Sequence, residues 1–225
     1  MGADGQLAAL VLADGRLPVG GHAQSGGLEP GLAAGLAPQQ IPDYIRGRLR
    51  TVGLVEAATA VLARRAAAAP DAVASLSRIG DAYLARTPSA PLRIVSEQVG
   101  RGMARLARVL WADAGPVAAL HELAAPPRPV ALGILAALGG LDDAQTARTS
   151  LYDDAQTVAS AATKLVPIDP VEPVRWLLTC GATLEEMVER AVAVTGPDDL
   201  PASAAPQAEQ WSLDHAARER RIFHA

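Results

Sequence analysis

The sequence predicts an all-α fold, a single domain of about ten helices around a central apolar helix. Three observations lead to this prediction. Apolar residues make up 50% of the chain but aromatic residues only 3%, so Leu, Val, Ile and Ala must build a core of closely packed helices. In most segments the apolar residues recur at three- and four-residue steps, as on one face of a helix. No segment alternates polar and apolar residues long enough to require a strand.

The first third of the chain predicts a loop followed by two long helices. Residues 14–31 are rich in glycine and proline, so we expect an ordered loop that leads into a short helix near Leu28–Leu36. Pro42 begins a helix whose apolar stripe continues to Leu62. A further helix begins at Pro70, and its inner face carries Val73, Leu76, Ile79 and Tyr83.

The middle of the chain predicts three helices, of which the last is the centre of the bundle. Ser89 can cap a helix whose apolar stripe reaches Leu110. Gly115 precedes a short helix that ends at Leu123. Val130–Leu138 is apolar on every side. A helix of that kind is buried all round, so we expect it at the centre.

The last third predicts more helices and a separate C-terminal segment. The expected helices are Asp142–Leu165, Val171–Leu178 and Leu184–Val194. Gly196–Pro206 contains three prolines and is expected to be a loop that sets the C-terminal segment apart from the core. We therefore treat residues 1–225 as one helical domain, in which residues 207–225 form a charged final helix and a tail that could dock on a partner.

Composition excludes several classes of protein. The net charge of −4 leaves no basic surplus for binding nucleic acid. The longest apolar stretch, Pro129–Leu141, is too short to span a membrane. Met1–Asp4 lacks the basic residues of a secretion signal, and Cys180 is the only cysteine, so it cannot form an internal disulfide. We expect a cytoplasmic protein.

Common enzyme motifs are missing from the sequence. A P-loop needs Gly-Lys-Ser/Thr, but the only lysine, Lys164, is followed by Leu165. Ser25 lies in AQSGG, which lacks the first glycine of a nucleophile elbow. His121 and Glu122 start like a zincin motif, but no second histidine follows one turn later. We expect no catalytic residues, although a hydrolase that uses Ser25 stays an alternative.

Three segments follow one another in the order and spacing of a known family. They are LPVGGHAQSGGLE at Leu17–Glu29, LR followed by EQ and Gly between Leu92 and Gly100, and SAATKLVPI at Ser160–Ile168. The ending RIF, Arg221–Phe223, and the preceding His215 fit the same pattern. In these segments the chain resembles the UreF family of urease accessory proteins over nearly its full length. His22 and Gln24 stand where that family has aromatic residues.

The resemblance implies a helical, non-enzymatic protein that forms a homodimer. It implies assembly with a UreD/UreH-like scaffold and a UreG-like GTPase, which the chain would recruit and regulate during nickel insertion into apo-urease. Nickel would be handled by the complex, and the chain would bind no cofactor of its own. The alternative is a helical regulatory or small-molecule-binding protein unrelated to nickel.

The resemblance also places the partner contacts. They are expected at Ser25, Glu29, Lys164, His215, Arg218, Arg221 and Phe223. Each has a simpler reading. The loop around Ser25 could be backbone architecture, Lys164 could only complement a helix dipole, and the tail could be a solvated helix. His22 is a candidate nickel ligand, although a lone histidine is more often only hydrogen-bonded.

Overall fold

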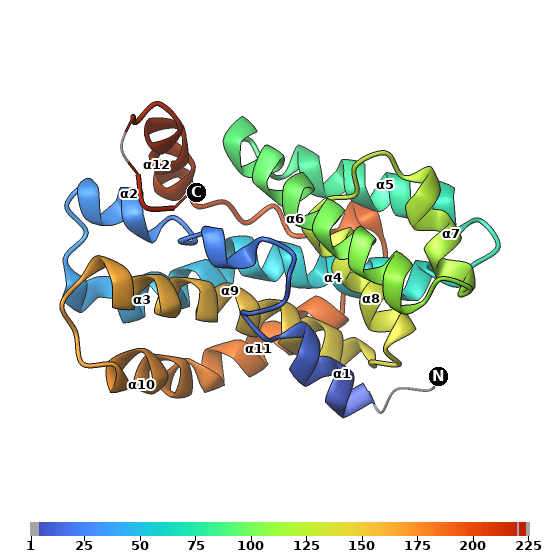
Figure 1. Ribbon diagram of the computed structural model, residues 1–225, viewed down its shortest axis with the longest axis horizontal. Coiled ribbons are helices and arrows are strands. Elements are labelled where there is room, and N and C mark those ends of the chain that lie inside the picture. Colours follow the sequence, from blue (N-terminus) through green and yellow to red (C-terminus); the bar gives the residue numbers. More distant parts are fainter. Residues whose placement is uncertain (1–4, 220, 224–225) are drawn as a thin grey trace.

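The computed structural model describes residues 5–219 and 221–223, and all regular structure within these ranges is helical (Figure 1). The α-helices are α1 (Gly5–Leu12), α2 (Leu28–Ala33), α3 (Ile41–Arg48), α4 (Leu54–Ala66), α5 (Ala72–Ala85), α6 (Ala90–Leu110), α7 (Gly115–Glu122), α8 (Arg128–Leu138), α9 (Asp143–Leu165), α10 (Val171–Thr179), α11 (Gly181–Val192) and α12 (Pro206–Ala216). The predicted all-α fold is confirmed. Parts of the predicted tail, residues 220, 224 and 225, lie outside the described residues.

The centre of the bundle is a pair of helices, α4 and α8. Every residue of α8 from Pro129 to Ala136 is buried, as its uniformly apolar sequence predicts. Helix α4 is likewise buried on all sides between Leu54 and Ala63, where Glu56 is the one residue that is not fully buried. The two helices approach so closely that a Cβ at Gly133 would collide with the carbonyl oxygen of Ala60. Only one apolar stripe of α4 is visible in the sequence, so this second central helix was not predicted.

The long helix predicted from Pro42 to Leu62 runs from Ile41 to Ala66 but contains a π-helical segment, η3 (Leu49–Gly53). A π turn holds one more residue than an α turn. On a regular α-helix, side chains eight positions apart differ in direction by about 80° around the helix axis. Because the π turn takes up one extra residue, this angle falls to about 20° here. Arg48 and Glu56, on either side of η3, therefore face the same interior cavity.

Helix ends follow the local sequence closely. Ser89 accepts a hydrogen bond from the backbone N–H of Leu92 and caps α6. Asp142 and Gln145 form a reciprocal capping box at the start of α9. Helix α1, which covers most of the apolar run before Asp14, was not predicted. It leaves Leu7, Leu10 and Val11 exposed.

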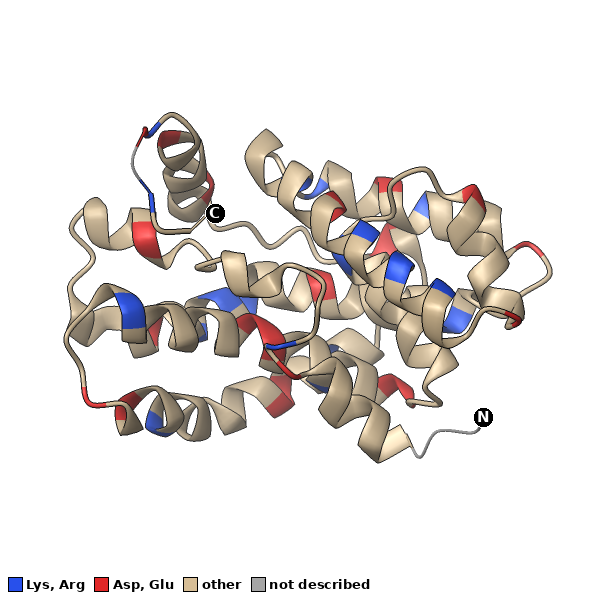
Figure 2. Cartoon of the chain, in the orientation of Figure 1, with Lys and Arg blue, Asp and Glu red and all other residues tan. Residues whose placement is uncertain are grey.

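Figure 2 shows acidic and basic residues interspersed along most of the helices. Within residues 5–219 and 221–223, none of the helices has both the length and the apolar character that a membrane crossing requires.

Candidate functional site

The C-terminal tail folds back onto the body of the protein. After α12 the chain turns and brings Phe223 against α2 and the end of α9, next to α12 itself (Figure 1). The Phe223 side chain is only 4% exposed and belongs to the hydrophobic core. The expectation that Gly196–Pro206 sets the tail apart from the core is therefore wrong. Leu200 of that loop belongs to the core, so the loop packs along the body of the protein and leads directly into α12.

A carboxylate in α2 holds the end of the tail. The two oxygens of Glu29 accept hydrogen bonds from the backbone N–H groups of Ile222 and Phe223, each at 2.8 Å. Such bonds to an ionised acceptor are stronger than neutral ones. Ser25, which is fully buried, in turn accepts a hydrogen bond from the Glu29 backbone N–H at 3.3 Å. Ser25 therefore helps to position the first turn of α2, and Glu29 holds the tail.

His215 and Lys164 complete this contact. His215 is 2% exposed, and its Nε2 lies 3.1 Å from the carbonyl oxygen of Phe223 and 3.8 Å from a Glu29 oxygen. The ammonium of Lys164 lies 5.2 Å from the centre of the Phe223 ring, within cation–π range. Lys164 is in the last turn of α9, where its charge also complements the helix dipole.

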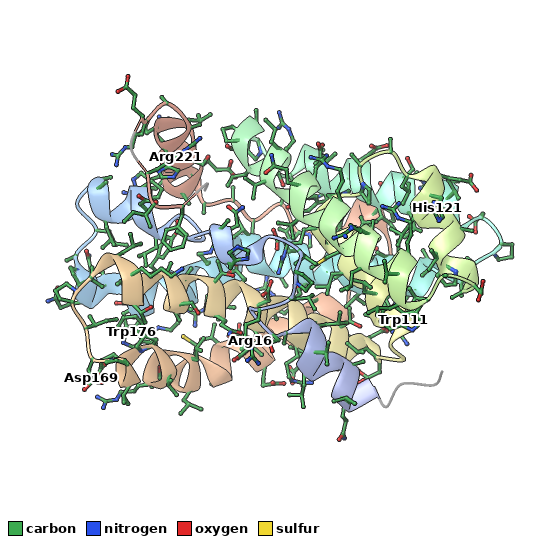
Figure 3. All side chains as sticks on the ribbon, in the orientation of Figure 1. Arg16, Trp111, His121, Asp169, Trp176 and Arg221 are labelled. Carbon is green, nitrogen blue, oxygen red and sulfur yellow. The ribbon has the colours of Figure 1, made fainter. Side chains whose placement is uncertain are left out.

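The structure thus brings five of the seven predicted partner residues into one intramolecular contact. Ser25, His215 and Phe223 are buried within the chain, so in this conformation they hold the tail rather than face a partner. The exposed members of the predicted set are Lys164, Arg218 and Arg221. Arg221 projects beside α12 at the edge of the molecule (Figure 3). Partner binding by these residues stays a prediction.

The loop before α2 owes its shape to glycine. Gly26 and Gly27 have φ of 60° and 79°, which side-chain-bearing residues rarely adopt. A Cβ at Gly27 would lie 2.6 Å from the Tyr44 hydroxyl, which donates a hydrogen bond of 2.8 Å to the Gly26 carbonyl. The backbone-architecture reading of this loop therefore holds at these two positions.

His22 is exposed and lines a second cavity, which Lys164 and Phe223 also border. No three side chains of His, Cys, Asp or Glu gather into a metal-binding group within the described part of the chain. The nickel-ligand role of His22 stays a prediction.

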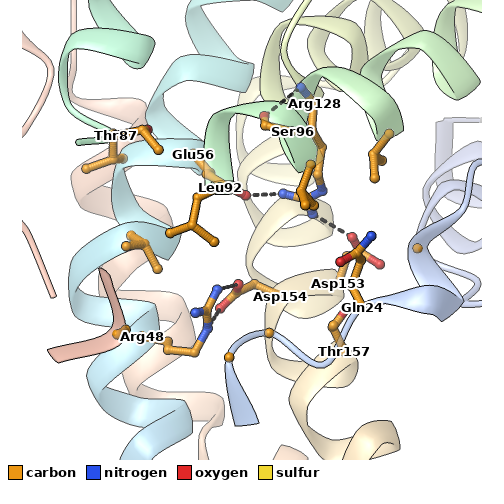
Figure 4. Close-up of a pocket in the computed structure, with 18 of the residues that line it drawn as sticks. Gln24, Arg48, Glu56, Thr87, Leu92, Ser96, Arg128, Asp153, Asp154 and Thr157 are labelled. Atoms are coloured by element: carbon orange, nitrogen blue, oxygen red, sulfur yellow. Dashed lines mark hydrogen bonds and ion pairs between the residues drawn. The ribbon is translucent and has the colours of Figure 1, made fainter. Parts of the chain in front are cut away.

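A network of buried ion pairs, which was not predicted from the sequence, lies in the interior near α12 (Figure 4). Arg48 of α3 makes two hydrogen bonds to Asp154 of α9, at 2.5 and 3.2 Å. Arg128 at the start of α8 is shared between Glu56 and Asp153, with 2.5 Å to the Asp153 oxygen. The network therefore joins the two central helices to α3 and α9.

Burial dominates the electrostatics of this network. It raises the pKa of Glu56, although Arg128 opposes the shift, and it also raises the pKa of the Tyr83 hydroxyl, which donates a hydrogen bond of 3.1 Å to Glu56. Burial works against the charged form of Arg48, but Asp154 and Tyr44 together outweigh it and raise the Arg48 pKa. Desolvation makes buried ion pairs weak contributors to stability.

The ion pairs line a cavity of about 160 Å³. Its apolar walls come mainly from α6 and from Leu12, Leu17 and Val19, and α12 contributes Glu209, Ser212 and His215 to the lining. Arg48 and Asp154 are 106 residues apart, so no local pattern reveals their pairing. One signal was readable in the sequence: Glu56 interrupts the otherwise apolar run of α4, and a charge inside such a run must find a buried partner.

Comparisons with known proteins agree on one family. The family model described as UreF matches residues 37–181. A urease accessory protein UreF of Mycobacterium sp. (strain JLS) is 35% identical over 220 residues, which cover 95% of this chain and 96% of that protein. Proteins of the same name from Mycobacterium marinum and Mycobacterium tuberculosis (strain CDC 1551 / Oshkosh) are 36% and 34% identical, again over 95% of this chain and 96% of theirs.

Proposed function

Because this chain belongs to the UreF family of non-enzymatic urease accessory proteins, we propose that it is a scaffold for nickel insertion into apo-urease. In this proposal it binds a UreD/UreH-like protein, and the two recruit and regulate a UreG-like GTPase. The observation that carries the proposal is the similarity to named urease accessory proteins over 95% of the chain. The nucleotide belongs to the GTPase, and nickel is handled by the complex.

The docked tail supports a specific contact with the UreD/UreH-like protein. Glu29 and His215 fix the tail against α2, and this presents Arg218 and Arg221 to solvent beside Ile222, which is 67% exposed. Arginines next to apolar side chains are typical of protein interfaces. In our proposal Arg218 and Arg221 touch the partner, whereas Ser25, Glu29, His215 and Phe223 keep the tail in the shape that the partner recognises.

Lys164 is proposed to face the GTPase. It is exposed on the side of Phe223 that borders the second cavity, so its charge is available beside the docked tail. The protein is further proposed to act in the cytoplasm as a homodimer.

A pull-down tests the proposed tail contact. The chain is co-expressed with its UreD/UreH-like and UreG-like proteins, and the capture of both is measured for an Arg218→Ala, Arg221→Ala double variant. Arg78→Ala with Arg105→Ala, two exposed arginines on α5 and α6, is the matched control. We expect the tail variant to lose the UreD/UreH-like protein, and the GTPase with it, while the control keeps both. Equal capture by the two variants would remove the tail from the interface.

The proposed role of Lys164 is tested by urease activity in cells that lack the native accessory protein. Lys164→Ala should reduce nickel-dependent activation, whereas Lys164→Arg, which keeps the cation, should retain most of it. Circular dichroism confirms that both variants fold. Normal activation by a folded Lys164→Ala protein would exclude Lys164 from the site.

A further inference from the structure

Helix α6 turns one long face to solvent. Its buried residues lie on the side that packs against the central helix α8. On the opposite side, within an arc of about 100° at about 3.6 residues per turn, lie Ile94, Arg101, Arg105, Arg108 and Val109. We call this set the α6 stripe. At a rise of about 1.5 Å per residue it extends over about 22 Å of the helix, which is long enough to bind a segment of another protein.

The α6 stripe concentrates positive charge in an acidic chain. The whole chain carries a net charge of −4, whereas α6 contains four arginines and a single acidic residue, Glu97. Figure 2 shows basic residues following one another along α6. Arg93 is bound to two backbone carbonyl groups before the helix, and Glu97 reaches Arg101 only at 4.0 Å. Arg101 and Arg105 are exposed and Arg108 is partly exposed, so a partner can reach all three guanidinium groups.

The chain itself does not neutralise the last two arginines of the stripe. Within residues 5–219 and 221–223, Arg105 and Arg108 make no hydrogen bond or ion pair, and the next acidic residues along the chain, Asp113 and Glu122, pair with neither of them. Like charges one turn apart on a helix repel each other. The helix dipole compensates only for Arg108, because it acts within the last turn. The positive charge of the stripe is therefore available to an anionic partner.

Apolar side chains at both ends of the stripe narrow the choice of partner. Ile94 and Val109 are each more than half exposed, and arginine beside apolar side chains is typical of protein interfaces. A nucleic acid backbone presents phosphates but no apolar surface to these two residues. A membrane would take up the apolar face of a helix, and that face of α6 is buried in the bundle. A protein segment with carboxylates between apolar side chains complements the whole stripe.

We propose that the α6 stripe docks an acidic segment of a third protein. The carboxylates of the segment lie against the three arginines, and its apolar side chains lie against Ile94 and Val109. Side chains one turn apart on a helix have Cβ atoms about 5–6 Å from each other, so a partner helix with a carboxylate in each of three successive turns matches the stripe. The site is independent of the proposed scaffold role, since the control variant of the pull-down carries Arg105→Ala and is expected to keep both assembly partners.

The test is a titration of the full chain with two synthetic helical peptides, followed by backbone amide NMR. One peptide carries glutamate at three positions one turn apart, between leucines, and the other carries glutamine at those positions. The glutamate peptide should shift the amide signals of residues 94–110 in a saturable way. It should bind about tenfold more tightly than the glutamine peptide, since three exposed ion pairs add up to roughly that factor. Salt at about 1 M, which screens charges beyond about 3 Å, should remove most of this difference.

Variants locate the site. Arg105→Gln with Arg108→Gln removes two of the three ion pairs and should weaken binding of the glutamate peptide about fivefold. Arg78→Gln with Arg190→Gln, the same change at exposed arginines of α5 and α11, should leave it unchanged. Val109→Ser should weaken binding of both peptides, because it removes an apolar contact and no charge. A thermal melt confirms that each variant is folded.

Four results would overturn the proposal. The glutamine peptide could bind as tightly as the glutamate peptide, or the glutamate peptide could bind the folded Arg105→Gln, Arg108→Gln protein as tightly as the parent. Its shifts could fall outside α6 or be absent at millimolar concentration. Finally, a single-stranded DNA oligonucleotide or vesicles of phosphatidylglycerol could bind the stripe more tightly than the glutamate peptide. Since none of these measurements involves urease or its accessory proteins, they leave the scaffold proposal to its own tests.

Discussion

The contact between α4 and α8 and the docking of the C-terminal tail are built in opposite ways. The two helices meet through alanine, glycine and aliphatic side chains that are fully buried, and Gly133 allows their backbones to touch. The tail is held by one aromatic ring, one carboxylate and one histidine. The first contact spreads its stability over many small groups and tolerates no added volume. The second depends on a few contacts at one end of the chain, so we expect it to open without unfolding the core.

The largest effect is expected from a charge at the centre. Leu135→Asp would bury an unpaired carboxylate in α8 and should cost about 4 kcal/mol or more of unfolding free energy, lowering the melting temperature by roughly 10 °C. Leu178→Asp, on an α10 side chain that is 78% exposed, is the control and should melt like the parent. Similar melting of Leu135→Asp and the parent would show that α8 is not central.

A single methyl group tests how closely the central helices approach. In Gly133→Ala the new Cβ would lie 2.7 Å from the Cβ of Ala63 as well as against the Ala60 carbonyl oxygen. Overpacking of this kind costs about 1–3 kcal/mol, to be measured by urea unfolding. Gly181→Ala adds the same methyl group where no heavy atom lies within 4 Å, so it should be neutral or slightly stabilising. Equal stability of the two variants would contradict the close approach.

Removal of the Phe223 ring should destabilise the C-terminal tail without affecting the central helices. Phe223→Ala removes the buried ring, and we expect a loss of about 1–2 kcal/mol, below the usual cost of a core phenylalanine because the segment is terminal. In hydrogen exchange the amides of Ile222 and Phe223 should lose protection while those of α4 and α8 keep it. Ile222→Ala, at an exposed neighbour, should change neither. Loss of protection throughout α8 would mean that tail and core unfold as one unit.

The smallest effect concerns the pH dependence of the buried network. Burial raises the pKa of Glu56 above its ordinary value of 4.5, so the folded state binds this proton more tightly than the unfolded state does. The resulting stabilisation of the fold is present at a pH below the pKa that Glu56 has in the unfolded chain. It is lost as the pH rises through the higher pKa that Glu56 has in the folded chain. Above pH 4.5 the parent should therefore lose stability relative to Glu56→Gln in urea unfolding. A difference between the two proteins that stays constant with pH would argue against this shift.

Glu185 offers a control of opposite sign. Its hydrogen bonds from Arg148 lower its pKa, so its contribution is present above the unfolded pKa and is lost as the pH falls. Glu185→Gln should thus lose stability relative to the parent only at the higher pH, and only slightly, because the pair is exposed.

Features that depend on residues close together in the sequence were predicted, whereas contacts between residues far apart in the sequence were not. Helix α8 was predicted because Val130–Leu138 is apolar on every side, and helix α9 because its apolar residues recur at helical spacing; both patterns lie within one short segment. The family resemblance located Glu29 and Phe223, but not that they bind each other across 194 positions. The pairing of Arg128 with Glu56 was missed for the same reason. Helix α1 was missed because eight residues with an exposed apolar face give too little pattern.

The π-helical segment has a consequence for the history of this chain. A helix that gains one residue can absorb it as a wider turn like Leu49–Gly53, so that both flanking halves stay where they were. Loss of one residue here, such as the exposed Arg50, would restore an ordinary turn and still leave Arg48 and Glu56 facing the cavity. We expect lineages of this family to differ in length by one residue at this point, so that the insertion dates the branch that carries it.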